Sequence, residues 1–263
     1  MSEERETASP HVITSVVKSL TLLQVFSDDI PRVTVSRAAE LTGMTRPSAR
    51  RILLTFVDQG FMYTDGREYW LSPKVMRLGF GYLSTLPFWE TAQPHLRELA
   101  TALQESCSLA TLDGDEVVYV IRVPVREGLL SLNVGSRLPA HATSLGKALL
   151  ATSRPETVER FLASGPFPAL TENTITEATE MEAEFARIRR RGYATANGER
   201  ELGVRSAAAP VLGADGYSVA AINVTANSVR VSQQTLEEKY APAVVRTAGA
   251  ISATLGYRAD PTP

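Results

Sequence analysis

The sequence predicts an α+β protein in two parts, an N-terminal winged helix-turn-helix followed by a larger α+β domain. Three observations predict this class. The N-terminal region holds three amphipathic helical segments, and two β-rich runs around an Asp-Gly pair follow them. From Trp89 onward helical and strand-like segments are mixed. We therefore expect domains at residues 11–73 and 89–258, joined by a linker helix at residues 74–88.

The helix-turn-helix is predicted element by element from apolar spacing and capping residues. A first helix is expected over residues 15–26, where apolar residues recur every three or four positions. Thr34 can cap a second short helix, which Gly43 ends in the left-handed conformation. A third helix covers residues 45–59, and the Asp65-Gly66 turn predicts the hairpin that forms the wing.

The third helix carries the candidate DNA-reading face. Its apolar stripe would pack inward, which leaves arginines and small polar groups exposed in the first two turns. Such a face suits the major groove, where arginine can bond guanine bidentately. Each arginine alone could equally be a solvated surface charge, and a winged helix can also dock proteins. The candidate DNA-binding residues are Thr45, Arg46, Pro47, Ser48, Arg50 and Arg51, with Arg67 beside the wing tip.

The second part is expected to form an antiparallel sheet with helices grouped around it. Expected helices cover residues 89–105, 144–151, 155–163, 179–191 and 232–255. Expected strands cover residues 108–112, 117–123, 129–134, 193–196, 206–212 and 217–225.

Composition narrows the possible partners and the compartment. The formal net charge is −2, so any nucleic-acid contact must come from a local basic patch. No apolar run approaches the ~20 residues that span a bilayer, and the first residues are acidic and polar rather than a secretory signal. The single cysteine, Cys107, allows no internal disulfide. We expect a cytoplasmic protein with no membrane contact.

The sequence resembles the IclR family of bacterial regulators over nearly its whole length. The most specific stretch runs from Gly135 to Ala151, and a second block contains Glu199 and Gly203-Val204-Arg205-Ser206. The resemblance implies a GAF-like effector-binding domain, a homo-oligomer (a dimer or a dimer of dimers) and palindromic double-stranded operator DNA. The run from Leu138 to Leu150 is similar in particular to the branch that regulates aromatic-acid catabolism through the β-ketoadipate pathway.

This branch implies a small organic acid, aromatic in character, as the effector. The start of the helix at Ser144 offers free N–H groups to an anion, and Asn223 and Thr225 share one face of a strand. Matching to the family's pocket positions gives Ser144, Leu145, Ser206, Asn223 and Thr225 as effector-binding candidates.

Three further candidates come from the residue pattern. Arg122 could bind a carboxylate if it points inward, or it could form a structural ion pair with Glu116 or another acid. Leu130 and Leu132 could form the apolar wall of a pocket, or they could be ordinary core residues. The hydroxyls of Ser206 and Thr225 could equally bond to backbone.

One departure from the family pattern concerns an acidic group. Many members carry an acidic pair before the conserved glutamate, whereas this chain has Ala196-Asn197-Gly198 before Glu199. We therefore expect one pocket carboxylate to be missing.

An enzyme is the weaker interpretation. The chain has no Ser-His-Asp context, no phosphate-binding glycine loop and no metal-ligand spacing, and His141 lacks partners for a metal cluster. We expect no catalytic residue, no metal and no cofactor. The alternative hypothesis is a GAF-like binding or enzymatic domain whose winged helix docks proteins.

Overall fold

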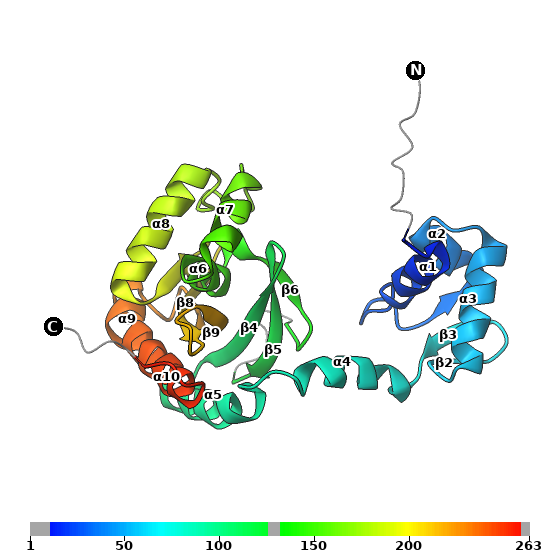
Figure 1. The fold of residues 1–263 in the computed structure, drawn as a ribbon, viewed down its shortest axis with the longest axis horizontal. Coiled ribbons are helices and arrows are strands. Elements are labelled where there is room, and N and C mark those ends of the chain that lie inside the picture. Colours follow the sequence, from blue (N-terminus) through cyan, green and yellow to red (C-terminus); the bar gives the residue numbers. More distant parts are fainter. Residues whose placement is uncertain (1–10, 126–131, 259–263) are drawn as a thin grey trace, which may run out of the picture. The chain divides into compact units, whose positions relative to one another are not determined.

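The structure is a computed structural model that describes residues 11–125 and 132–258 (Figure 1). The chain divides into two compact units, of which the first ends at Thr85 and the second begins at Leu86. This division lies inside the segment predicted to be a linker. None of the helices in the described residues has both the length and the apolarity needed to cross a bilayer.

The first unit is a winged helix-turn-helix. Its helices are α1 (Thr14–Leu23), α2 (Val35–Thr42), α3 (Arg46–Asp58) and α4 (Met76–Leu83), with a 3₁₀ turn η1 (Pro73–Val75) before α4. Its strands β1 (Val33–Thr34), β2 (Met62–Thr64) and β3 (Glu68–Leu71) form an antiparallel sheet in the order β1-β3-β2.

The predicted cap and end of α2 are confirmed, and Thr45 caps α3. The Arg37 N–H donates to Thr34 Oγ1 at 3.2 Å, and the Ser48 N–H donates to Thr45 Oγ1 at 3.4 Å. Gly43 ends α2 with φ +67°, a conformation that costs a residue without a Cβ little. These local interactions fix where α2 stops and α3 starts.

Two details of this unit differ from the prediction. Helix α1 ends at Leu23 instead of residue 26, because Val25 bonds back to Leu22 and a turn between Ser27 and Ile30 follows. The short strand β1 was not predicted. It forms because the residue that caps α2 is itself extended and lies beside β3.

The second unit is built on a six-stranded antiparallel sheet in the order β6-β5-β4-β9-β8-β7. In chain order the strands are β4 (Ser106–Asp113), β5 (Glu116–Val123), β6 (Arg137–Pro139), β7 (Ala194–Asn197), β8 (Val204–Leu212) and β9 (Ser218–Asn227). Every neighbouring pair is antiparallel, as expected for an α+β domain.

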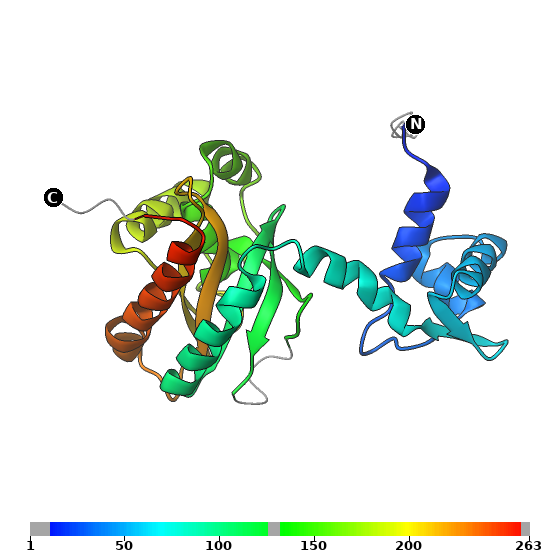
Figure 2. The same cartoon turned by 60° about the horizontal axis from the view of Figure 1, so that its bottom comes forward.

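Helices cover both faces of this sheet. Helices α5 (Trp89–Leu103) and α10 (Ala241–Thr254) lie together on one face, and α6 (Ser144–Ala151), α7 (Pro155–Ala163) and α8 (Ala178–Arg191) lie on the other (Figures 1 and 2). The central strands β8 and β9 carry buried alanines at Ala207–Ala209 and Ala220–Ala221. Their small side chains let helices approach the sheet closely from both sides.

One prediction for this unit is wrong, and another differs in detail. Of the strand predicted at residues 129–134, residues 129–131 lie outside the described residues and 132–134 are not a strand. A turn at Gly135, with φ +91°, brings the chain back so that β6 pairs with β5 instead. The predicted terminal helix is present from Gln233 to Thr254, with one π-helical turn, η3 (Leu236–Tyr240), between α9 (Gln233–Thr235) and α10. Pro242 explains this turn, since proline has no N–H for the helical ladder.

Candidate functional site

The predicted reading face of α3 is exposed. Ala49 and Leu53 are completely buried in the core of the first unit, where Ile52, Phe56 and Val57 pack against the same cluster. The predicted DNA-binding side chains lie on the remaining surface. Thr45, Arg46, Pro47, Arg50, Arg51 and Arg67 are exposed, and Ser48 is half-buried.

The arginines of α3 have no acidic neighbour to neutralise them. Within the described residues no carboxylate forms an ion pair with Arg46, Arg50 or Arg51, whereas Arg37 on α2 pairs with Glu40 at 2.9 Å. The start of α3 therefore presents a local positive surface on a chain of net negative charge.

Two sets of contacts determine the shape of the wing and its position beside α3. The N–H groups of Arg67 and Glu68 donate to Asp65 Oδ1 at 2.9 and 2.7 Å, and these bonds lower the pKa of the Asp65 carboxyl. Lys74 Nζ donates to the carbonyl oxygen of Gln59 at 2.7 Å and lies over the Phe61 ring. The first contact shapes the wing tip that carries Arg67, and the second ties the wing's exit to the end of α3.

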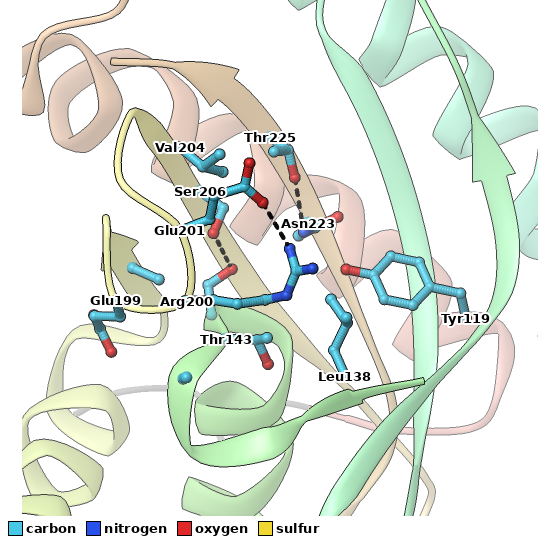
Figure 3. A pocket seen from close by; sticks show the side chains of 13 residues that line it. Tyr119, Leu138, Thr143, Glu199, Arg200, Glu201, Val204, Ser206, Asn223 and Thr225 are labelled. Carbon is cyan, nitrogen blue, oxygen red and sulfur yellow. Dashed lines mark hydrogen bonds and ion pairs between the residues drawn. The ribbon is translucent and has the colours of Figure 1, made fainter. Parts of the chain in front are cut away.

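A cavity lies in the second unit where β5, β8 and β9 meet the start of α6 (Figure 3). Its volume is about 30 Å³. The described residues that line it are Tyr119, Leu138, Ala142, Thr143, Ser144, Ala196, Glu199, Arg200, Glu201, Val204, Ser206, Asn223 and Thr225.

Strand register brings the polar residues of the cavity together. Thr225 pairs with Ser206 across β8 and β9, and Asn223 lies two residues earlier on the same face. Ser144 Oγ at the start of α6 donates to Ser206 Oγ at 2.7 Å, which joins the helix to the sheet. Asn223 Nδ2 donates to Thr225 Oγ1 at 3.1 Å. Asn223 Oδ1 is buried and has no hydrogen-bond partner.

The start of α6 is already partly capped. Thr143 Oγ1 accepts the Gly146 N–H at 3.0 Å, so one of the N–H groups expected to face an anion is used within the protein. An added Cβ on Gly146 would lie 2.2 Å from the carbonyl oxygen of Ala140. Only glycine therefore allows α6 to pack this closely against the turn η2 (Ala140–Ala142).

A buried ion pair anchors the loop between β7 and β8. Lys147 Nζ, whose side chain is 1% exposed, lies 2.6 and 2.7 Å from the two carboxylate oxygens of Glu199. The hydroxyls of Thr171 and Thr174 donate to the Glu199 carbonyl oxygen at 3.1 and 2.6 Å. This pair holds the backbone from which Arg200 reaches the cavity.

The charged residues at the cavity lie on this loop. Arg200 Nη1 is 3.2 Å from Glu201 Oε2, and the guanidinium extends toward the Tyr119 hydroxyl (Figure 3). Burial raises the pKa of Tyr119 to about 12, while the charges of Arg122 and Arg200 act in the opposite direction. The Tyr119 phenol is therefore protonated at neutral pH and able to donate a hydrogen bond.

The structure brings together four of the predicted effector residues, Ser144, Ser206, Asn223 and Thr225. Of the other four candidates, Leu145, Leu132 and Arg122 are not among the described residues that line the cavity. Leu145 is one residue further along the helix and faces the core, where Leu132 also packs. Leu130 lies outside the described residues. Arg122, on the cavity face of the sheet, donates to Ser108 Oγ at 3.4 Å.

Two alternatives from the sequence are also decided by geometry. Glu116 does not pair with Arg122: its Oε2 lies 2.7 Å from Arg137 Nε, with which it forms an ion pair. His141 is structural: its Nε2 donates to the Pro168 carbonyl oxygen at 2.9 Å and its ring stacks on Phe167. The described residues contain no group of three His, Cys, Asp or Glu side chains placed to hold a metal ion.

Sequence reasoning missed Tyr119, Arg200 and Glu201. Strand alternation with Val117 could have placed Tyr119 on the inner face of β5. No periodicity marks the loop residues Arg200 and Glu201, and only their alternating charge distinguishes them. The expected absence of the acidic pair before Glu199 stays a prediction about the effector, and Glu201, at a different position, supplies a carboxylate to the cavity lining.

Comparison with known proteins covers both units. Residues 15–66 match the IclR helix-turn-helix domain, and residues 80–253 match the family described as bacterial transcriptional regulator IclR C-terminal. A relative from Pseudomonas putida, the Pca regulon regulatory protein, is 35% identical over 90% of this chain and 82% of its own.

Two solved structures are similar. A candidate transcriptional regulator from Rhodococcus sp. RHA1 is 39% identical, with a TM-score of 0.83 over 93% of this chain and 98% of its own. The inducer-binding domain of a double mutant of the PobR transcription factor from Acinetobacter, in complex with 3-hydroxybenzoic acid, is 33% identical. It covers 62% of this chain and 96% of its own with a TM-score of 0.57.

Proposed function

Because the chain belongs to the IclR family of bacterial transcription regulators, we propose that it reads a palindromic operator through α3 and the wing. We further propose that a small aromatic acid bound in the cavity of the second unit changes its operator affinity. The observation that carries the DNA proposal is the arginine-bearing face of α3, which packing leaves exposed and which no described acid neutralises.

The reading roles follow from the position of each side chain. Thr45, Arg46, Pro47 and Ser48 occupy the first turn of α3 and its cap, the part of a recognition helix that meets base edges. Arg50 and Arg51 follow on the exposed surface, where a guanidinium can bond O6 and N7 of a guanine. Arg67 at the wing tip is placed for a phosphate or the minor groove.

We propose a homo-oligomer, a dimer or a dimer of dimers, and exposed apolar surface on the first unit supports this proposal. Val16 and Leu20 on α1 are 50% and 53% exposed, and Leu78 and Phe80 on α4 are 57% and 58% exposed. Apolar surface of this extent favours contact with a second copy. Two copies related by a two-fold axis would present two reading heads to a palindrome.

The effector class rests on the cavity and on the relatives. The cavity offers hydroxyls, an amide and one guanidinium, which suit a small polar anion. The Pca and PobR relatives are regulators, and a double mutant of the PobR inducer-binding domain is in complex with 3-hydroxybenzoic acid in its crystal structure. We propose that this chain controls genes of aromatic-acid catabolism, those of the β-ketoadipate pathway in particular. It would bind its effector without converting it and act in the cytoplasm, where the DNA lies.

The mechanism is a population shift between states of different operator affinity. An effector can change operator binding only by the difference in its own affinity for those states. The cavity must therefore differ between the DNA-competent and DNA-incompetent states.

The first test of the DNA proposal is selection of duplexes from a random library, followed by binding measurements on the selected sequence. We expect a palindrome, and a steep loss of affinity with salt from counterion release. Replacing Arg51 by alanine should cost roughly 1–3 kcal/mol. Arg97→Ala, which removes an equal charge from an exposed position on α5, is the matched control and should leave binding unchanged. Equal affinities for the two variants would remove Arg51 from the reading face, and weak salt dependence would favour a protein-docking role.

A further inference from the structure

The cavity of the second unit is too small for the ligand that the proposed function requires. Its volume of about 30 Å³ holds little more than one water molecule. Pockets that take small organic ligands have volumes of roughly 300–1,000 Å³. An aromatic acid can therefore enter only if a side chain of the lining gives up its position.

The side chains able to move are Arg200 and Glu201. Ser144, Asn223 and Tyr119 are at most 3% exposed and are held by strands or by the start of α6. The Arg200 and Glu201 side chains are 31% and 50% exposed, and they belong to the loop. Figure 3 shows the Arg200 guanidinium extending across the space between Ser206 and Tyr119.

Among the described residues that line the cavity, Arg200 is the only basic one. Of the nearby cations outside this lining, Lys147 is buried and lies within 2.7 Å of both carboxylate oxygens of Glu199, and Arg122 donates to Ser108 Oγ at 3.4 Å. The partner of Arg200 in the described structure is the Glu201 carboxylate, at 3.2 Å. An exposed ion pair of this kind adds little stability. Replacing the Glu201 carboxylate by another carboxylate on Arg200 therefore costs little free energy.

A second, independent feature points to a ligand in the same space. Asn223 is 3% exposed, its Nδ2 is used by Thr225, and its Oδ1 has no partner. A buried acceptor without a donor is costly to leave unsatisfied. A ligand hydroxyl placed in the cavity would supply the donor that this oxygen lacks.

We propose that Glu201 occupies the place of the effector's carboxylate on Arg200, and that the effector displaces it. This proposal rests on the proposed function and names the ligand class, a small planar hydroxy acid. Its carboxylate accepts hydrogen bonds from the Arg200 guanidinium, whose planar N–H groups match the two oxygens of a carboxylate. Its hydroxyl donates to Asn223 Oδ1.

The loop backbone need not move in this exchange. The Lys147–Glu199 pair and the two threonine hydroxyls fix residue 199. Rotation of the Arg200 and Glu201 side chains is then enough to open the cavity. Glu201 thus acts as an internal competitor that sets the effector concentration to which the protein responds.

Calorimetric titration of the full chain tests the proposal, with 4-hydroxybenzoate, 4-hydroxybenzamide and benzoate as probes. The unmodified chain should bind 4-hydroxybenzoate more tightly than the amide, which lacks the negative charge, and more tightly than benzoate, which lacks the hydroxyl. Glu201→Gln should tighten 4-hydroxybenzoate binding by up to about five-fold, since it removes the competitor.

Arg200→Gln should weaken 4-hydroxybenzoate binding by roughly 10- to 150-fold and abolish discrimination against the amide. Arg200→Lys should fall between the two, because it keeps the charge without the planar fork. Asn223→Leu should remove the preference for 4-hydroxybenzoate over benzoate. Arg154→Gln is the matched control, since Arg154 forms an exposed ion pair with Asp215 outside the cavity lining. Its affinity should equal that of the unmodified chain.

The outcomes separate this proposal from the proposed function. Tight 4-hydroxybenzoate binding that Arg200→Gln leaves unchanged, or that Glu201→Gln fails to tighten, would overturn the exchange and leave an aromatic-acid regulator standing. Absence of binding by the unmodified chain to all three probes would overturn both. The expected effect of Glu201→Gln is a gain in 4-hydroxybenzoate affinity. This measurement therefore tests the proposal even if the Arg200 variants do not fold.

Discussion

Replacing Lys147 by methionine should strongly destabilise the second unit. Methionine keeps the length of the side chain but removes the ammonium that lies 2.6 and 2.7 Å from the Glu199 carboxylate. The carboxylate would then stay in a site where Glu199 is only 9% exposed, with no described cation replacing Lys147. Removing one partner of a buried pair costs about 3–5 kcal/mol. We expect a cost near the lower end of this range, because the Glu199 side chain is 11% exposed and solvent can partly stabilise its charge.

Urea unfolding followed by circular dichroism measures this cost. The double variant Lys147→Met/Glu199→Leu should recover most of the loss, since an apolar pair of similar volume needs no desolvation of charge. The control is Arg137→Met, which breaks an ion pair with Glu116 whose side chains are each 44% exposed, and should cost at most about 1 kcal/mol. If Lys147→Met loses no more than this control, or the double variant is as unstable as the single, the pair does not stabilise the domain as argued.

Two further stability predictions follow from the same region. Gly146→Ala should destabilise by at least about 1–3 kcal/mol, because its Cβ would lie 2.2 Å from the Ala140 carbonyl oxygen. Gly249→Ala in α10, where no heavy atom lies within 4 Å, should instead be neutral or stabilising in the same urea assay. Burial lowers the pKa of His141 below its ordinary value of 6.5, so the unfolded chain binds the proton more readily. Its contribution to stability is therefore present above about pH 6.5 and is lost as pH falls through the lower folded pKa. His141→Gln should flatten this part of a stability profile from pH 8 to 5, whereas His95→Gln should leave it in place, and an unchanged slope in His141→Gln would contradict the assignment.

Local interactions explain why the reading head was predictable. Thr34, Gly43 and Thr45 cap or end helices through backbone groups within a few residues of themselves. Their effect can therefore be predicted from the neighbouring sequence. The inward stripe through Ala49 and Leu53 follows from helical periodicity alone.

The cavity was only partly predictable because long-range register assembles it. Ser206 and Thr225 were found through matching to family positions, and the sheet register then pairs them directly. Leu145 follows Ser144 by one step along the helix, which rotates its side chain by about 100° toward the core, and it is not among the described residues that line the cavity. Arg200 and Glu201 reach the cavity from a loop whose backbone is held by the Lys147–Glu199 ion pair. No rule of residue spacing predicts an ion pair between residues so far apart in the sequence.

The proposed function requires that the ligand site and the DNA site are energetically coupled. The most direct test measures operator affinity of the full chain with and without saturating 4-hydroxybenzoate, and 4-hydroxybenzoate affinity with and without saturating operator. We predict that each ligand changes the other's affinity by the same factor, roughly 5- to 150-fold, because equilibrium coupling is reciprocal. Tight binding of both ligands with neither affecting the other would contradict the claim.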